Sequence, residues 1–491
     1  MKKRVLMIVS LILCLACLFS CTASGVVETT DSEKQSESVT ESESKSETES
    51  ETETETETET ETETESATET ETESATETES ESATETESES ATESATESET
   101  ESETESETES ETESESETES ETESETESET EDKDPVPGVT KTDETLEAKV
   151  YKLSENPDFF RFIGRSKQIT DGVLCDHSAS GIEFQGYFTG DVTMAITTSY
   201  ETYYTVYIDG VRSETRVHAP AGTNKAIKIA TFEGNYFHTI KILKQSEIGW
   251  TTSTLKELNV TGYLVDAPED RKLYFEFYGD SLTSGFGNIG SPYANSPHDE
   301  PKYQDATQTY GFLLSEMANA DCSILAMSGV GLAEGYYDNP FLDYFSKYSH
   351  KRGNEKFDFE GARVPDAVFI HLGANDESCG DNPNNIRGYG ENTGSFKDNF
   401  KAKAKELIKY IREGYNADMP IVWAYDPWEG LPNYIEEVIE ELGGDSARLY
   451  MIELEWHGIS GYTGAGTHPS VAAHKAHCYQ LAELVLEKDI V

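Results

Sequence analysis

Four short motifs contain the residue types that acyl transfer requires, and they follow one another along the chain. They are Gly279-Asp-Ser281, Ser328-Gly-Val-Gly331, Gly373-Ala-Asn-Asp376 and Gly466-Thr-His-Pro469. Together they supply a hydroxyl, a glycine turn, a side-chain amide and an imidazole. A serine hydroxyl needs a base to become a nucleophile, and the oxyanion of a tetrahedral intermediate needs hydrogen-bond donors.

These tasks divide among a few residues. We expect Ser281 to be the nucleophile and His468 the general base. The expected oxyanion donors are the backbone N–H groups of Ser281 and Gly329 and the side-chain amide of Asn375. Gly329 suits this task because glycine lets the backbone approach a substrate closely, and Gly331 is its less favoured substitute.

A second motif overlaps the serine motif and indicates a different chemistry. Gly285, Gly287 and Gly290 spell G-x-G-x-x-G, which opens a helix in dinucleotide-binding proteins. Here Pro292 and Pro297 follow at once, and proline breaks helices. We therefore expect no cofactor, and we interpret the glycines as shaping a flexible loop over the cleft.

The elements that must position the four motifs alternate between strand and helix. Apolar runs predict strands within residues 272–279, 322–329, 366–376, 420–428 and 447–456. Helical patterns occupy residues 309–320, 395–414, 433–444 and 470–488. Such alternation indicates a parallel sheet covered on both faces, whose functional groups gather at the carboxyl ends of the strands.

The preceding residues have a different pattern. Runs rich in β-branched and aromatic residues lie at 192–200, 203–211, 226–232 and 237–244, and helical patterns are few. We predict a β-sandwich over residues 145–266, followed by an α/β domain over residues 267–491.

The order of the motifs resembles a known family. GDSL, SGVG, GAND and a histidine before the last helix resemble the four blocks of the SGNH (GDSL) hydrolase superfamily. A β-sandwich directly before such a domain resembles carbohydrate esterase family 2, whose members remove acetyl groups from plant cell-wall polysaccharides. The resemblance implies a three-layer α/β/α catalytic domain preceded by an all-β, jelly-roll-like sandwich. It implies the same roles for Ser281, His468, Gly329 and Asn375, with no metal or cofactor.

The chain departs from the superfamily pattern three residues before His468. An aspartate is common there, but this chain has Ala465. An acceptor is still needed to hold the imidazole tautomer. We expect a Ser-His dyad with a backbone carbonyl near Gly466 in place of the acid, as the resemblance to family 2 implies. Glu453 and Glu455 are the rival acceptors.

Other residues extend the candidate site. Trp428 and Tyr336 are candidate substrate contacts, because a sugar-processing cleft often has an aromatic wall. His474 and His477 lie one turn apart on the last predicted helix. Without nearby acidic or cysteine ligands we interpret them as a solvated helix face and expect no metal site.

The first residues have the features of an export signal. Three positive residues precede an apolar run from Val5 to Phe19, which is too short to favour a membrane-spanning helix. The run ends in Leu-Phe-Ser-Cys21, which resembles the lipobox of bacterial lipoproteins. We expect residues 1–21 to be a signal that leaves Cys21 lipidated, so that the exported protein is anchored at the outer side of the cell envelope. Ordinary signal cleavage and secretion is the alternative.

A low-complexity segment separates this signal from the predicted domains. Residues 41–131 contain 40 Glu and one Lys among Ser, Thr and Ala, and they carry most of the net charge of −61. Such a segment cannot bury enough apolar surface to fold, so we predict a disordered stalk over residues 22–144. Residues 145–491 have 50 acidic and 30 basic residues, which does not favour nucleic-acid binding.

The motifs favour a serine esterase, and the resemblance to family 2 implies that it removes O-acetyl groups from xylan or mannan fragments. One alternative is an esterase for lipid, aryl or envelope-glycan esters. The other is a surface carbohydrate-binding protein without activity. The polysaccharide, any disulfide pairing and the role of the sandwich stay open.

Overall fold

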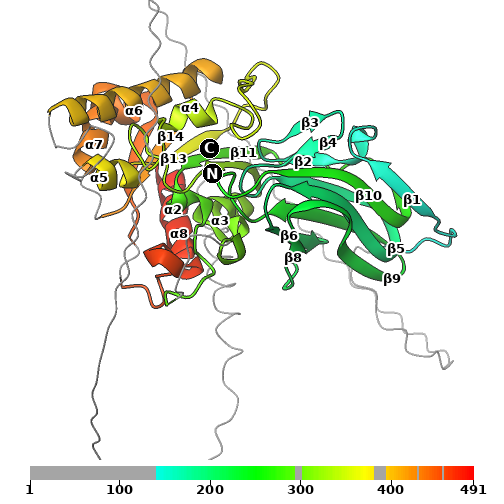
Figure 1. Ribbon diagram of the computed structural model, residues 1–491. Coiled ribbons are helices and arrows are strands. Elements are labelled where there is room, and N and C mark those ends of the chain that lie inside the picture. The colour runs from blue at the N-terminus through cyan, green and yellow to red at the C-terminus, as the bar shows by residue number, and fades with distance from the viewer. Residues whose placement is uncertain (1–139, 294–300, 381–393, 428–430, 456–457) are drawn as a thin grey trace, which may run out of the picture. The chain divides into compact units, whose positions relative to one another are not determined.

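The structure is a computed structural model that describes residues 140–293, 301–380, 394–427, 431–455 and 458–491. Cys21, Trp428 and nearly all of the predicted stalk lie outside these residues, so the predictions about them stay predictions. Figure 1 shows an antiparallel sheet, which comes first in the described chain, and a parallel sheet with its helices, which follows.

The antiparallel sheet has ten strands, arranged mainly in the order β3-β4-β10-β5-β9-β6-β7. Its strands are β1 (Ala148–Lys152), β2 (Arg161–Ile163), β3 (Lys167–Ile169), β4 (Gly172–Leu174), β5 (Gly181–Thr198), β6 (Thr202–Ile208), β7 (Val211–Arg212), β8 (Val217–Ala219), β9 (Gly222–Lys244) and β10 (Ser253–Leu264). The 3₁₀ helix η1 (Pro157–Phe159) lies between β1 and β2. The long strands β5, β9 and β10 curve around one apolar core, in which Phe184 and Phe188 are completely buried (Figure 1).

Two predicted strand runs, at 226–232 and 237–244, belong to the single strand β9. Gly234, between them, has a φ of 78° and resembles a turn residue in the sequence. In the structure the pairing shifts register there, between Phe188 and Gly190 of β5, and Gly190 has a φ of 69°. A β-bulge absorbs the positive φ angles and lets the strand continue.

The parallel sheet has five strands in the order β12-β11-β13-β14-β15. They are β11 (Leu273–Gly279), β12 (Ala320–Ala326), β13 (Ala367–His371), β14 (Ile421–Tyr425) and β15 (Leu449–Glu453). The helices are α2 (Ser281–Ser284), α3 (Tyr310–Met317), α4 (Phe341–Phe345), α5 (Ala374–Gly380), α6 (Gly394–Gly414), α7 (Pro432–Glu441) and α8 (Val471–Glu487). Short 3₁₀ helices are η3 (Pro301–Tyr303), η4 (Ala306–Gln308), η5 (Gly444–Ala447) and η6 (Ala465–Thr467).

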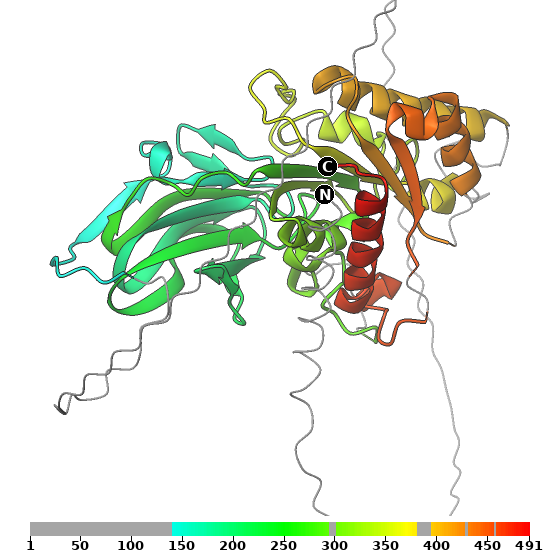
Figure 2. The same cartoon turned by 180° about the vertical axis from the view of Figure 1, so that it is seen from behind.

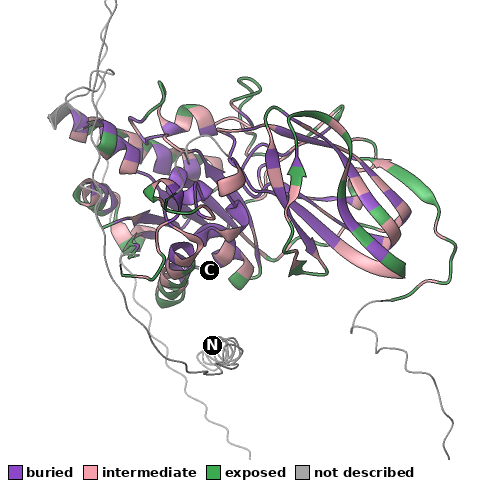
Figure 3. Ribbon diagram, turned by 60° about the horizontal axis from the view of Figure 1, so that its bottom comes forward, coloured by how far each residue is buried: buried purple, intermediate pink, exposed green. Residues whose placement is uncertain are grey.

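Helices cover both faces of the parallel sheet. Figures 1 and 2 show α6 and α7 on one face and α3 and α8 on the other. A hydrophobic core lies on each face of the sheet, and neighbouring residues of β13 point into different cores. Val368 packs in the core that includes α6 and α7, and Phe369 packs in the core that includes α3 and α8. Figure 3 shows the strands between them as buried. The predicted fold class, a three-layer α/β/α domain preceded by an all-β domain, is confirmed.

The strand order places a functional site at one edge of this sheet. From β11 the chain passes to β12 on one side and then to β13 on the other side. Such a reversal opens a crevice at the carboxyl ends of the central strands.

Among the described residues, none of the helices is both long and apolar enough to cross a membrane.

Candidate active site

Ser281 lies two residues after the end of the interior strand β11, at the first position of the one-turn helix α2. Asp280 caps this helix, because its Oδ1 accepts a hydrogen bond from the N–H of Leu282 at 2.9 Å. Gly285 ends the helix in the left-handed region, with a φ of 84°. The cap and the glycine confine the serine to a single turn above the strand end.

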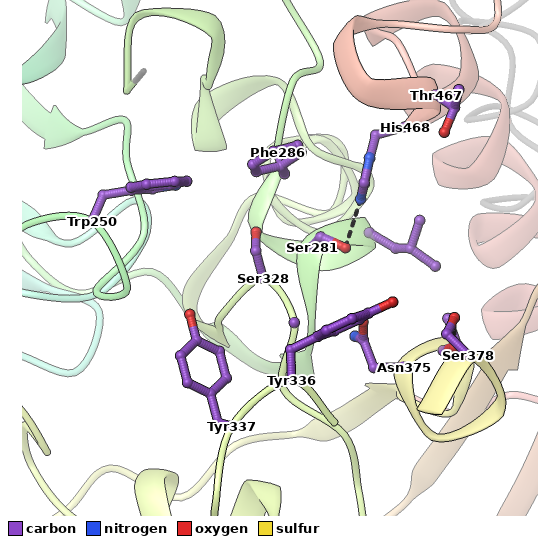
Figure 4. A pocket seen from close by; sticks show the side chains of 13 residues that line it. Trp250, Ser281, Phe286, Ser328, Tyr336, Tyr337, Asn375, Ser378, Thr467 and His468 are labelled. Atoms are coloured by element: carbon purple, nitrogen blue, oxygen red, sulfur yellow. Dashed lines mark hydrogen bonds between the residues drawn. The ribbon is translucent and has the colours of Figure 1, made fainter. Parts of the chain in front are cut away.

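His468 contacts Ser281 through one ring nitrogen (Figure 4). Its other ring nitrogen contacts a backbone carbonyl. Its Nε2 lies 2.8 Å from Ser281 Oγ, and its Nδ1 lies 2.8 Å from the carbonyl oxygen of Gly466. A carbonyl oxygen can only accept, so Nδ1 must carry the hydrogen of the neutral ring. Nε2 is then the acceptor for the serine hydroxyl, which is the tautomer that a general base needs.

The acceptor carbonyl belongs to a strained turn. Gly466 and Thr467 both have a φ of 63°, which is unusual for a β-branched residue such as Thr467. Thr467 Oγ1 also donates to the Gly466 carbonyl at 2.6 Å. Backbone strain of this kind persists only where the surroundings enforce it, and it often occurs at functional sites.

The glycines of the G-x-G-x-x-G motif pack against this histidine turn. The Gly287 carbonyl accepts from the N–H of Ala465 at 2.9 Å. A Cβ atom at Gly287 would overlap the Ala465 carbonyl oxygen, and one at Gly290 would overlap the Ala465 side chain. Our interpretation of these glycines as a flexible loop over the cleft is therefore wrong, because two of them are close-packing positions.

Ser281, Gly329, Asn375 and His468 all line one cavity of about 620 Å³. Gly331, the less favoured donor, is not among the lining residues, and it packs against the backbone of Glu334. The structure thus brings together the four residues for which the sequence predicts catalytic roles.

The side-chain amide of Asn375 is already engaged in this structure. Its Nδ2 lies 3.0 Å from Asp280 Oδ2 and 3.0 Å from the carbonyl oxygen of Val330. Both partners are acceptors, so both amide hydrogens are used. One of these hydrogens must leave its present acceptor before Asn375 can donate to an oxyanion. The role of Asn375 as an oxyanion donor stays a prediction that requires this change.

Asn375 lies in the first turn of helix α5, which begins directly after the loop that follows β13. Its neighbour Asp376 is completely buried and accepts from the N–H groups of Leu332 at 2.7 Å, Ala333 at 2.7 Å and Glu334 at 2.8 Å. The acidic residue of the GAND motif therefore holds the turn after β12. This role of Asp376 is not among the sequence predictions.

Aromatic side chains form part of the cavity wall (Figure 4). Tyr336, a predicted substrate contact, lines the cavity and is 60% exposed, and Tyr337 lies beside it. Trp250 also lines it, although it comes from the segment between β9 and β10. Its ring stacks on Phe286 at a centroid distance of 6.3 Å. Trp250 is not among the predicted site residues, because no local sequence signal connects a loop of the β domain with the serine.

The two histidines of helix α8 are buried, so the predicted solvated helix face is wrong for them. His474 and His477 are at most 1% exposed and lie against Tyr310 of α3, at ring distances of 5.9 and 6.2 Å. Burial lowers the pKa of His477 to about 3 and that of His474 well below its usual value. In the part of the chain that the structure describes, no group of three or more His, Cys, Asp or Glu side chains is placed to hold a metal ion.

Fold and site together resemble one class of hydrolase. A Ser-His pair at the carboxyl edge of a parallel sheet, with a glycine turn and an asparagine after the next strands, is similar to the SGNH-type arrangement. Residues 162–268 match the family model described as Carbohydrate esterase 2 N-terminal. The expected resemblance to carbohydrate esterase family 2 is thereby confirmed.

Two curated relatives agree with this resemblance. The cellulase/esterase CelE of Acetivibrio thermocellus is 26% identical over 341 residues, which cover 65% of this chain. The acetylxylan esterase / glucomannan deacetylase of Cellvibrio japonicus is 26% identical over 204 residues, or 41% of this chain. The matches span 38% and 55% of the lengths of these two relatives.

Solved structures share the fold. An acetyl xylan esterase from Butyrivibrio proteoclasticus superimposes with a TM-score of 0.61 at 18% identity, covering 70% of this chain and 98% of its own. A family two carbohydrate esterase from Clostridium thermocellum, in complex with cellohexaose, gives a TM-score of 0.57 at 24% identity. That match covers 68% of this chain and all of the esterase chain.

Proposed function

We propose that the protein is a serine esterase that removes O-acetyl groups from plant cell-wall polysaccharides. The observation that carries this proposal is the Ser281–His468 contact of 2.8 Å at the wall of a 620 Å³ cavity, with the imidazole tautomer fixed by the Gly466 carbonyl. The two curated relatives, a cellulase/esterase and an acetylxylan esterase / glucomannan deacetylase, support the ester class.

The reaction proceeds in two acyl-transfer steps. Ser281 Oγ attacks the acetyl carbonyl carbon while its proton passes to Nε2 of His468. The imidazolium then protonates the sugar oxygen, the C–O bond of the ester breaks, and an acetyl-serine remains. A water molecule, deprotonated by the same nitrogen, attacks the acetyl-serine, and acetate leaves as Ser281 regains its proton.

The oxyanion of each tetrahedral intermediate needs donors beside Ser281. We assign this role to the backbone N–H groups of Ser281 and Gly329, both of which line the cavity. Asn375 joins them when one of its amide hydrogens leaves the Val330 carbonyl. Glu453 and Glu455, the rival acceptors for the imidazole, have no part in this scheme. Glu453 instead accepts a hydrogen bond from the Tyr425 hydroxyl at 3.2 Å.

The aromatic cavity wall favours a sugar-bearing ester over a simple one. Trp250, Tyr336 and Tyr337 offer ring faces on which a pyranose can pack, and the neighbouring hydroxyl of Ser328 offers a polar contact. We therefore propose xylan or glucomannan chains as the acetylated substrates. An esterase for simple aryl or lipid esters would not need this wall.

Acetate release tests both the chemistry and the substrate. We expect wild-type protein to deacetylate acetylated xylan or glucomannan and an aryl acetate, and Ser281→Ala or His468→Ala to lose at least about a thousandfold in kcat. The double variant Glu453→Gln/Glu455→Gln should retain activity. Equal, near-zero rates for wild type and Ser281→Ala would favour the carbohydrate-binding alternative. Activity on the aryl acetate alone would favour the second esterase alternative.

We also propose that a lipid on Cys21 and the acidic stalk hold the catalytic part away from the outer side of the cell envelope. The lipobox-like sequence and the charge of residues 41–131 support this arrangement. Metabolic labelling with a fatty acid in a bacterial host should mark the wild type and not Cys21→Ala. Equal labelling of both would contradict lipidation at this residue.

A further inference from the structure

The segment between β9 and β10 belongs to the antiparallel domain, yet it contacts the catalytic edge of the parallel sheet. Its Glu247 is 1% exposed. Both carboxylate oxygens accept from the backbone N–H of Ser328 at 3.0 Å, and Oε2 also accepts from the Ser328 hydroxyl at 2.7 Å. Ser328 directly precedes Gly329, a proposed oxyanion donor. Glu247 therefore holds the turn that carries this donor.

A second contact connects Glu247 with the nucleophile helix. Gln304 Nε2 lies 3.3 Å from Glu247 Oε2, 3.2 Å from the carbonyl oxygen of Ser284 and 3.1 Å from the Ser284 hydroxyl. Gln304 Oε1 accepts from the N–H of Glu247 at 3.1 Å. Ser284 is the last residue of α2, which begins at Ser281. One hydrogen-bond network thus joins the glycine turn, the carboxylate and the helix of the serine.

The backbone that carries this carboxylate is held by its own domain. Lys244 Nζ donates to the backbone carbonyls of Ser246 at 2.9 Å and Glu247 at 3.1 Å. A Cβ atom at Gly249 would overlap Glu247 Oε1, so only glycine leaves the carboxylate in its position. A buried anion is costly unless hydrogen bonds satisfy it, and charge-assisted hydrogen bonds are short and strong. The network therefore rigidifies the turn.

Rigidity matters here because oxyanion stabilisation depends on donors placed before the charge develops. A displacement of about 1 Å can reduce the rate about a hundredfold. We propose that Glu247, a residue of the β domain, is a positioning residue for ester hydrolysis that aims the N–H of Gly329 at the oxyanion. This inference rests on the proposed function. It makes the β domain a structural part of the active site, in addition to any contact of Trp250 with substrate.

Aryl acetate kinetics of three variants and a matched control test this inference. Glu247→Ala should lower kcat about 10- to 100-fold, with little change in KM. Glu247→Gln should recover most of the rate, because its amide oxygen still accepts from Ser328 and its amide nitrogen can donate to the hydroxyl. Gly249→Ala keeps the carboxylate but displaces it, so its kcat should also fall.

Asp176 provides the control. Its carboxylate is also 1% exposed and lies in the same domain, and it accepts from Ser349 at 2.6 Å and Arg352 at 2.7 Å, but it does not line the cavity. Asp176→Asn should lower the melting temperature and leave kcat close to wild type. Unchanged kcat in Glu247→Ala, or an equal loss in Asp176→Asn, would overturn the proposal.

Hydrogen exchange gives a readout that needs no reaction. In Glu247→Ala, peptides covering residues 327–335 should exchange faster than in wild type at a temperature well below unfolding. Unchanged exchange there would overturn the positioning role. A wild type that hydrolyses no ester would refute the proposed function, whereas the exchange comparison would still decide whether Glu247 holds the turn.

Discussion

Gly287→Ala tests whether close packing of the glycine motif positions the catalytic histidine. Gly287 has a φ of 67°, and a methyl group there would overlap the carbonyl oxygen of Ala465, three residues before His468. Neither backbone segment can move freely, because the N–H of Ala465 bonds to the Gly287 carbonyl at 2.9 Å. The substitution should therefore shift the histidine turn.

The expected magnitude has two parts. An L-residue in the left-handed region costs about 1–2 kcal/mol. Overpacking against the backbone adds about 1–3 kcal/mol, so Gly287→Ala should lower the free energy of unfolding by about 2–5 kcal/mol. Displacement of His468 from Ser281 should lower kcat by up to about a hundredfold.

Gly190→Ala is the matched control for this variant. Gly190 has nearly the same φ, 69°, but a methyl group there meets no atom within 4 Å. Gly190→Ala should lower the free energy of unfolding only by the cost of the left-handed backbone conformation, about 1–2 kcal/mol, and should leave kcat unchanged. Urea unfolding and aryl acetate kinetics of the two variants provide the comparison. Equal stability losses and equal kcat values in both variants would refute the packing argument.

Two further predictions concern residues next to the dyad. Because Thr467 has a φ of 63°, Thr467→Gly should be more stable than Thr467→Ala by about 1 kcal/mol in urea unfolding, and the reverse order would contradict strain at this turn. Burial raises the pKa of Asp280 to about 6 in the folded protein, above its unfolded value, so the folded state binds the proton more tightly between about pH 4 and pH 6. The free energy of unfolding of the wild type, relative to that of Asp280→Asn, should therefore fall by about 3 kcal/mol as the pH rises through this window. If this difference did not change with pH, the raised pKa of Asp280 would be contradicted.

Much of the fold and the central site residues follow from local sequence patterns. Four of the five strands of the parallel sheet lie within predicted apolar runs, and β12 begins two residues before its run. The motifs that follow β11, β12 and β13 lie at the same edge because the strands are parallel. The proximity of these three motifs could thus be anticipated without knowing how the helices pack, whereas the 2.8 Å contact between Ser281 and His468 could not. The bulge at Gly234 could not, because a glycine with positive φ has the same appearance in a turn and in a bulge.

The misses concern contacts between segments that are distant in the sequence. His474 and His477 look solvated on an isolated helix, and only the packing of α8 against Tyr310 buries them. Glu247 and Trp250 belong to the β domain, and nothing in their neighbourhood indicates a catalytic edge. Such contacts depend on how the two sheets pack, which no periodicity encodes.

The missing aspartate and the glycine motif are two aspects of one arrangement. Ala465 is completely buried against Gly290, so the position of the usual acid is filled by a methyl group. The close approach that the glycines permit fixes the turn that exposes the Gly466 carbonyl to His468. A carbonyl sets the tautomer as well as a carboxylate does, because both can only accept. It adds no negative charge to stabilise the imidazolium, so transition-state stabilisation depends more heavily on the oxyanion donors. The hydrogen bonds of Glu247 and Asp376 to the glycine turn between them support that side of the site.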